Sequence, residues 1–167
     1  MLHFMGQPWW CARGDLGPWA SDIASAHNSQ HLFDPYTLTH VLHGVLLYAA
    51  VRALAGGALG QRARFTIALA AEAAWELFEN TDSVVERYRQ ATMSLDYYGD
   101  SVFNSLGDIA ACAVGYGAAM TLPVWGSGVL IAAIEVLLLL WIRDSLLLNV
   151  LMLVRPIEAV KDWQLGG

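Results

Sequence analysis

The residues best suited to chemistry in this sequence are histidines, acids and amides that recur three or four positions apart. Side chains at that spacing lie on one face of a helix. Imidazole and carboxylate groups brought together can bind a divalent metal ion or move protons in acid–base catalysis. The stripes are His40 and His43; then Glu72, Glu76, Glu79 and Asn80; then Asp100, Asn104 and Asp108.

Two overlapping sets of roles follow from these residue types. One is catalysis, with a glutamate as general base and the histidines as metal ligands or a proton relay. The candidate catalytic residues are Glu72, Glu76, Asp100, Asn104 and Asp108. The other is the binding of a divalent metal ion as cofactor. Its candidate ligands are His40, His43, Glu76 and Asp108. We assign no residue to an organic cofactor.

The stripes stand out because the rest of the chain is apolar. Of its 167 residues, 56% are hydrophobic and only 14% are charged, whereas soluble domains carry about 25% charged residues. A charge at the centre of a bilayer costs about 2.5–3.5 kcal/mol, so the stripes are expected to face one another, water or a metal. The composition therefore favours a polytopic membrane protein, and the net charge of −6 argues against a nucleic-acid partner.

Non-catalytic interpretations of the same residues stay open. His40 and His43 are explained equally well as core histidines bonded to the backbone or to the acids. The central glutamates can pair with Arg64 or Arg143, and Asp100 can cap a helix. The cluster would then be a structural network that fixes helix register. Intramembrane acids also form proton paths, so a small proton-coupled transporter acting as an oligomer is a third hypothesis.

Other reactive residues give weaker patterns. His27 and His31 are four apart in HNSQH but lie on no recognisable helix, which makes the metal signal weak. Cys11 and Cys112 provide neither a disulfide framework nor a zinc ribbon, and Cys112 lies in an apolar run typical of a core. No G-x-S-x-G motif is present for a serine nucleophile.

The elements that must position the stripes are indicated by apolar runs and helix-end signals. Residues 1–35 are polar and broken by Gly and Pro, which predicts an irregular interfacial segment and no signal peptide. Asp34 and Pro35 form a helix-start signal. The helix that follows, 36–55, has about the 20 residues needed to cross a bilayer.

The remaining chain continues the same bundle. The expected segments are a helix at 64–80, a polar connector at 81–98, a helix from about Gly99, a helix at 124–142, an apolar stretch at 145–154 and a tail at 155–167. Arg143 and Asp144 are expected to form an interfacial ion pair, and Glu135 to join the polar network. We therefore predict an all-α fold, with about four transmembrane helices over 36–154 in a single domain.

Charge predicts the orientation of this bundle. Arg52, Arg62 and Arg64 surround the first turn, which places that turn in the cytoplasm by the positive-inside rule. Residues 1–35 and the connector at 81–98 then face the opposite side. The predicted location is the inner membrane, with the lipid bilayer as partner.

Several long motifs resemble a known family. They are HNSQHLFDPYTLTHVLHGVLLY, EAAWELFENTDSVVERYRQATMSLDYYGDSVFNSLGDI, LPVW, IRDSLLLNVLML and DWQ. Together they resemble uncharacterised protein family 0314, a proteobacterial family of inner-membrane proteins, over residues 5–164. The resemblance implies a multi-pass membrane protein of unknown function. Members usually carry another apolar helix before the position of Met5, which the present sequence does not include.

A looser likeness concerns the polar residues alone. An acid and a histidine on one helix, a glutamate on the next and Asp…Asn…Gly on the third are similar to VanZ-like membrane proteins. The matching positions are Asp34, His40, Glu72 or Glu76, Asp100, Asn104 and Gly107. This resemblance implies a shared helical core that handles cell-envelope lipids or glycopeptide-related stress.

We expect a multi-pass inner-membrane protein whose buried polar site acts on cell-envelope lipids or lipid-linked groups. The expected chemistry is acid–base or metal-assisted transfer or hydrolysis. The alternatives are a non-catalytic assembly or envelope-stress factor with a structural polar cluster, and the transporter described above.

Overall fold

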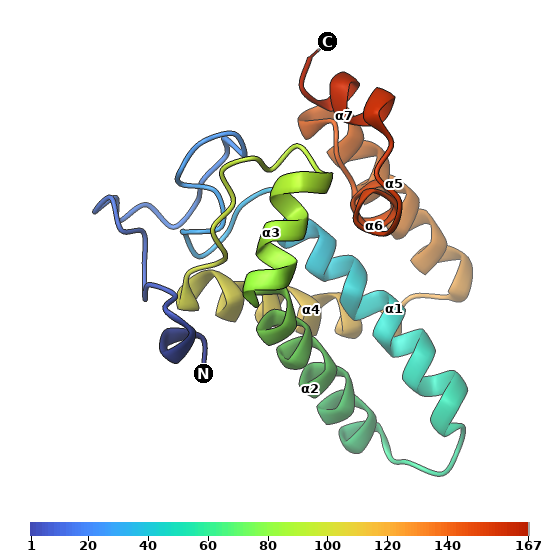
Figure 1. The fold of residues 1–167 in the computed structure, drawn as a ribbon. Helices are drawn as coiled ribbons and strands as arrows, with labels where there is room; N and C mark the ends of the chain where they lie inside the picture. The colour runs from blue at the N-terminus through green and yellow to red at the C-terminus, as the bar shows by residue number, and fades with distance from the viewer. Residues whose placement is uncertain (167) are drawn as a thin grey trace.

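The computed structural model describes residues 1–166 and is shown in Figure 1. Within that range the regular secondary structure is helical, with seven α-helices, one short 3-10 helix and no β-strand. The elements are η1 (Leu2–Met5), α1 (Thr37–Ala55), α2 (Gln61–Glu79), α3 (Asp82–Ala91), α4 (Val102–Thr121), α5 (Val124–Ile142), α6 (Leu146–Val154) and α7 (Glu158–Gln164). The predicted all-α fold is confirmed.

The start of α1 follows from the predicted acid–proline signal. Asp34 Oδ1 accepts hydrogen bonds from the backbone N–H groups of Tyr36, at 2.8 Å, and Thr37, at 3.3 Å. These are donors that a helix leaves unpaired at its first turn. Pro35 precedes them, so the helix begins one residue later than predicted, at Thr37.

The most extensive helix contact is between α1 and α4, and glycines make it possible. A Cβ atom at Gly44 of α1 would collide with the backbone carbonyl of Cys112 on α4. A Cβ at Gly115 of α4 would collide with the backbone carbonyl of Val41 on α1. Gly117 faces open space. Small residues on α4 therefore allow close helix approach, as predicted, but only on the side that faces α1.

Around this pair, α1 lies between α2 and α5 (Figure 1). The loop from 56 to 60 returns the chain antiparallel from α1 to α2. On the other side, Leu42 of α1 packs with Ile134 and Leu138 of α5 in a buried apolar cluster. This packing brings the N-terminal half of α1 to the centre of the molecule.

The polar segment at 81–98, expected as a connector, contains the helix α3. Val85 and Tyr88 on its inner side form a buried cluster with Tyr97, and Leu153 of α6 packs against that cluster. Arg87 also donates from Nε to the carbonyl of Leu153, at 2.8 Å. Contacts with a part of the chain more than 60 residues away thus stabilise a helix whose own composition is polar.

The end of α5 differs from the prediction in its side-chain contacts. Arg143 takes a left-handed conformation, with φ 54°, and its side chain donates to the carbonyl of Trp163. Asp144 is buried and accepts from Tyr36 and Asn149. The predicted Arg143–Asp144 ion pair is therefore wrong, because the two side chains leave the turn in different directions. The break also makes α6 a separate helix.

Two of the described helices, α1 and α5, are long and apolar enough to cross a membrane. The acids on α2, and Asn104 and Asp108 on α4, interrupt the other two expected spans. Four spans are therefore not confirmed, although all four expected helices are present with bounds close to those predicted.

Candidate functional site

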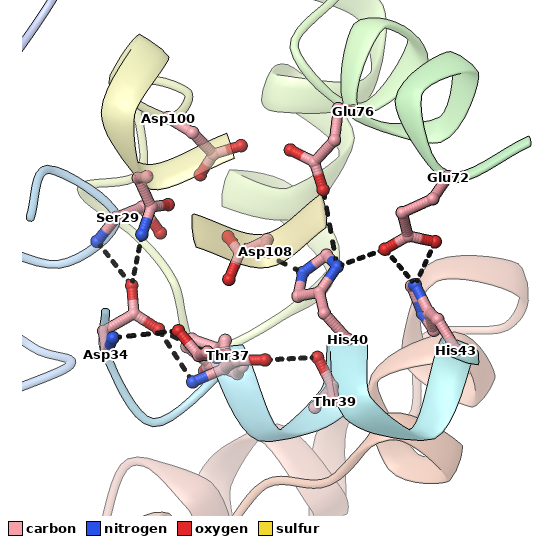
Figure 2. A network of polar contacts seen from close by, with 12 residues as sticks. Ser29, Asp34, Thr37, Thr39, His40, His43, Glu72, Glu76, Asp100 and Asp108 are labelled. Atoms are coloured by element: carbon pink, nitrogen blue, oxygen red, sulfur yellow. Dashed lines mark hydrogen bonds and ion pairs between the residues drawn. The ribbon is translucent and has the colours of Figure 1, made fainter. Parts of the chain in front are cut away.

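The three predicted stripes meet at a buried cluster between α1, α2 and α4 (Figure 2). His40 Nδ1 lies 2.7 Å from Glu72 Oε1 and 3.4 Å from Glu76 Oε1. His43 Nδ1 lies 3.1 Å from both carboxylate oxygens of Glu72. On the other side of its ring, His40 Nε2 lies 3.9 Å from Asp108 Oδ2. One imidazole thus connects acids from two different helices.

These contacts indicate which nitrogen of the His40 ring carries a proton. Nδ1 faces two carboxylates, so it carries a proton that it donates to Glu72. The gap of 3.9 Å between Nε2 and Asp108 is too long for a hydrogen bond. The ring is therefore anchored at one nitrogen and free at the other, which suits a proton carrier or a metal ligand.

Several carboxylate oxygens in the cluster lack donors. Among the described residues, neither oxygen of Glu76 nor Oδ1 of Asp108 has a hydrogen-bond partner. The neighbouring hydroxyl of Ser105 is also unpaired within the described part of the chain. Glu76 is 2% exposed and Asp108 4%. Buried polar atoms are normally bonded, so this set of oxygens is suited to receive a proton, a metal ion or a polar substrate group.

A second group of polar residues, beside the first, is held by hydrogen bonds within the protein. Asn104 Nδ2 donates to the carbonyl of His31 at 2.8 Å and lies 3.4 Å from Asp34 Oδ2. Asp100 Oδ2 accepts from Asn80 at 2.7 Å and from Tyr97 at 3.0 Å. These side chains hold the loops before α1 and α4 in place.

The predicted cap at Asp100 is wrong. Ser101 caps α4, because its hydroxyl accepts from the backbone N–H of Asn104 at 3.1 Å. Asp100 lies one residue earlier and points toward α2, where Asn80 bonds it twice. Burial raises the pKa of the Asp100 carboxyl above its ordinary value, and the bonds from Asn80 and Tyr97 oppose that rise.

The structure divides the predicted residues between the two groups. The open cluster contains His40, His43, Glu72, Glu76 and Asp108. Asp100 and Asn104, predicted as catalytic, belong to the bonded group. The predicted pairing of the glutamates with Arg64 or Arg143 is not seen, since histidines occupy that role.

Metal-ligand geometry is available at two overlapping positions. Ligand atoms of His40, His43 and Glu72 all lie within 4.8 Å of one another, as do those of His40, Glu76 and Glu79. Glu79 lies on the predicted stripe of α2 but was assigned no role from sequence. Imidazole and carboxylate ligands of this kind suit a divalent ion such as zinc.

A cavity of about 670 Å³ extends from the open cluster toward α5 and α6. Its polar end includes His40, His43 and Glu72. Its apolar walls include Leu42, Leu46, Ile131, Leu146, Val150 and Leu153. Glu135 lines this cavity as well, rather than joining the open cluster. Sequence periodicity gave no signal for the α6 wall, because α6 reaches the cavity only through the turn at 143–145.

Comparison with known proteins identifies relatives over nearly the whole chain. The family model described as "Protein of unknown function (DUF2585)" matches residues 2–166. A UPF0314 protein of Paracoccus denitrificans is 46% identical over 163 residues, covering 98% of this chain and 84% of that protein. A UPF0314 protein of Sinorhizobium fredii is 47% identical over 165 residues, covering 98% and 83%.

A third relative, a UPF0314 protein of Sphingopyxis alaskensis, is 41% identical over 170 residues, covering 100% of this chain and 88% of that protein. No solved structure matches the chain significantly. The predicted resemblance to uncharacterised protein family 0314 is confirmed. The predicted likeness to VanZ-like proteins finds no support in the matching family model or in these relatives.

Proposed function

The chain belongs to the DUF2585 family of proteins of unknown function, and on that premise we propose an inner-membrane protein that acts on a lipid-linked molecule. The observation that carries this proposal is the cavity, which joins apolar walls to the open cluster of imidazoles and carboxylates. A ligand that fills it needs an apolar chain and a polar group at one end. Lipids and lipid-linked groups have that chemistry.

The surface of the helices supports a membrane location. Only 22% of the apolar window of α5 and 33% of that of α1 is buried inside the protein. Large side chains such as Val124 and Leu140 of α5 are 92% and 82% exposed. A core helix of a soluble protein buries such residues, whereas a membrane helix presents them to lipid. We propose that α2 and α4 also cross the membrane, with their acids turned toward α1.

The open cluster supports acid–base hydrolysis of an ester-type bond near the polar group. A water oxygen adds to the carbonyl carbon or phosphorus while its proton passes to Nε2 of the His40 ring, which lines the cavity. The bond to the leaving oxygen then breaks as that oxygen takes a proton from the Asp108 carboxyl, which also lines the cavity and lies 3.9 Å from the same nitrogen. Glu72 holds that ring in place through Nδ1, at 2.7 Å. A divalent ion on the histidines and Glu72 would supply Lewis acidity for the same reaction.

The first test concerns the ligand. Leu46 lines the cavity, whereas Leu54 lies two turns further along α1 and is 89% exposed. We expect the Leu46→Trp variant, purified in detergent, to retain several-fold less lipid than wild type, because the indole fills the cavity. Leu54→Trp is the matched control and should retain the wild-type amount. Mass spectrometry of the extracted lipid measures both, and equal retention by both variants would contradict the proposal.

The second part of the test concerns the reaction. Wild-type protein reconstituted with lipids of the host membrane should convert one lipid class, which mass spectrometry identifies. Asp108→Asn should abolish that conversion while still retaining lipid. Glu86→Gln, on the exposed side of α3, is the control and should behave as wild type. Conversion at the wild-type rate by Asp108→Asn would exclude the assigned acid.

A structural role for the polar residues is the second candidate, and one observation favours it. Asp100 and Asn104 have their bonding groups engaged within the protein. Under this alternative the open cluster also serves only helix packing. Lipid retention that is the same for all variants, together with lower unfolding temperatures for His40 and Glu72 variants, would favour it.

A further inference from the structure

We propose that a second cluster, formed by Cys11, His27 and His31 in the N-terminal segment, is a zinc site, with the nearby and more exposed Asp15 carboxylate able to turn into the fourth position. The ligand atoms of the first three residues all lie within 4.8 Å of one another. Asp15 Oδ2 lies 3.9 Å from His31 Nε2. This site lies outside the cavity and does not depend on the proposed function.

The distances match those around a tetrahedral zinc ion. Zinc–nitrogen and zinc–sulfur bonds of about 2.1 and 2.3 Å place two ligand nitrogens about 3.4 Å apart and a nitrogen and a sulfur about 3.6 Å apart. In the structure, His27 Nδ1 lies 3.2 Å from His31 Nε2. The same Nδ1 lies 3.3 Å from Cys11 Sγ. Two edges of one face of such a tetrahedron are therefore close to the expected lengths, and the third, from Cys11 Sγ to His31 Nε2, is within 4.8 Å.

Protons alone do not explain these contacts. His31 Nδ1 faces the carbonyl of Gly17, so that nitrogen carries the proton and Nε2 of the neutral ring presents a lone pair. His27 Nδ1 contacts both that lone pair and the Cys11 sulfur. A single ring nitrogen is either a donor or an acceptor: as a donor it divides one proton between two acceptors, and as an acceptor it faces the lone pair of His31 Nε2. A cation that accepts all the lone pairs satisfies every contact at once.

The surrounding fold holds the ligands as a metal site requires. Cys11 is 5% exposed and His31 is fully buried. Trp10 packs edge-on against the His31 ring and donates from its indole to the carbonyl of Asp15 at 2.6 Å. The other carboxylate oxygen of Asp15 bonds the backbone N–H of Gly17 at 2.9 Å. The turn from Asp15 to Gly17 thus fixes the Asp15 carboxylate and the Gly17 carbonyl that orients His31. Trp10, which bonds this turn, directly precedes Cys11 in the chain.

The role of the site is structural. The backbone carbonyl of the ligand His31 accepts a hydrogen bond from the Asn104 side chain. The backbone carbonyl of Ser29 accepts one from the backbone N–H of Ser101, at 2.9 Å. Zinc would therefore tie the irregular segment to the start of α4, beside Asp34. A thiolate and two imidazoles fill three positions, and the Asp15 carboxylate would complete the four that are typical of closed structural sites.

Metal content and cobalt spectroscopy of the full-length protein in detergent test this proposal. Wild type and Cys112→Ala should bind zinc equally, whereas Cys11→Ser should bind one equivalent less. With Co²⁺ in place of zinc, we expect a thiolate-to-cobalt charge-transfer band and tetrahedral visible bands. The thiolate band should persist in Cys112→Ala and in His40→Ala, and disappear in Cys11→Ser. The His40→Ala variant separates this site from any ion at the open cluster.

Milder variants guard against misfolding. Asp15→Asn leaves three ligands and should bind Co²⁺ more weakly while retaining the thiolate band. In the Cys112→Ala background, the Cys11 thiol should react slowly with a thiol reagent until a chelator removes zinc. Equal zinc content in wild type and Cys11→Ser, or a cobalt spectrum without a thiolate band, would overturn the proposal.

Discussion

At the scale of single residues, the buried acids differ in how many donors they face. Asp34 accepts from the backbone of Ser29, Tyr36 and Thr37, and Asn104 lies close to the same carboxylate. Burial raises the pKa of the Asp34 carboxyl, and these bonds oppose that rise. Glu76 has no hydrogen-bond partner in the described part of the chain. The first acid is held by the fold, whereas the second is open to a ligand.

This difference predicts opposite effects of two isosteric substitutions on stability. Asp34→Asn turns an amide donor toward existing donors, so we expect a loss of about 1–3 kcal/mol in the free energy of unfolding. Glu76→Gln replaces an unpaired buried acid with a neutral group and should leave the unfolding temperature unchanged or raise it. Thermal unfolding in detergent, followed by circular dichroism, measures both. Asp22→Asn, on an exposed turn, is the control.

At the scale of elements, the close contact of α1 with α4 holds the His40 ring against Asp108. That contact depends on Gly44 and Gly115, which face the backbone of the opposite helix. Any side chain at either position separates the two helices. The open cluster would then widen between α1 and α4 while the α1–α2 contacts remain.

We therefore expect Gly115→Ala to destabilise the protein by about 1–3 kcal/mol, as overpacking of a tight contact does. Gly117→Ala lies on the same helix, faces open space and should be neutral or slightly stabilising. Thermal unfolding compares the two variants. Equal unfolding temperatures would show that the α1–α4 contact is less tight than described here.

At the scale of the whole molecule, the arrangement of helices places the open cluster near one end of the helix bundle. The N-terminal half of α1, the C-terminal half of α2 and the N-terminal half of α4 meet there. The short helices α3 and α6 lie at the same end, where they pack against each other. If the positive-inside rule holds for the 56–60 turn, this end faces away from the cytoplasm.

Reporter fusions test this arrangement and count the spans. Alkaline phosphatase, which is active only outside the cytoplasm, should be inactive when fused after Leu59 and active when fused after Leu95. If only α1 and α5 cross the membrane, both positions lie on the same side and both fusions should be inactive. A green fluorescent protein fusion at each position is the reciprocal control and should show the opposite pattern.

The sequence by itself determined the helices and the polar stripes, because both depend on local spacing. The helix-start signal at Asp34, the apolar run after it and the stripe on α2 are each defined by residues that lie close together in the sequence. The prediction that the stripes of His40 and Glu72 face one another, water or a metal also needed only that polar stripes are costly in contact with lipid. Helix α3 was missed because its stability comes from contacts with Leu153, which are remote in sequence.

Only the tertiary structure decided which of these groups are bonded and which are open. Asp100 and Glu76 look alike as buried acids in the sequence, yet one accepts from Asn80 and the other has no hydrogen-bond partner in the described chain. The approach of Cys11 to His27 likewise needs a chain reversal across 16 residues. Periodicity fixes the side of a helix on which a residue lies, whereas distances of a few ångströms between segments depend on how the whole chain packs.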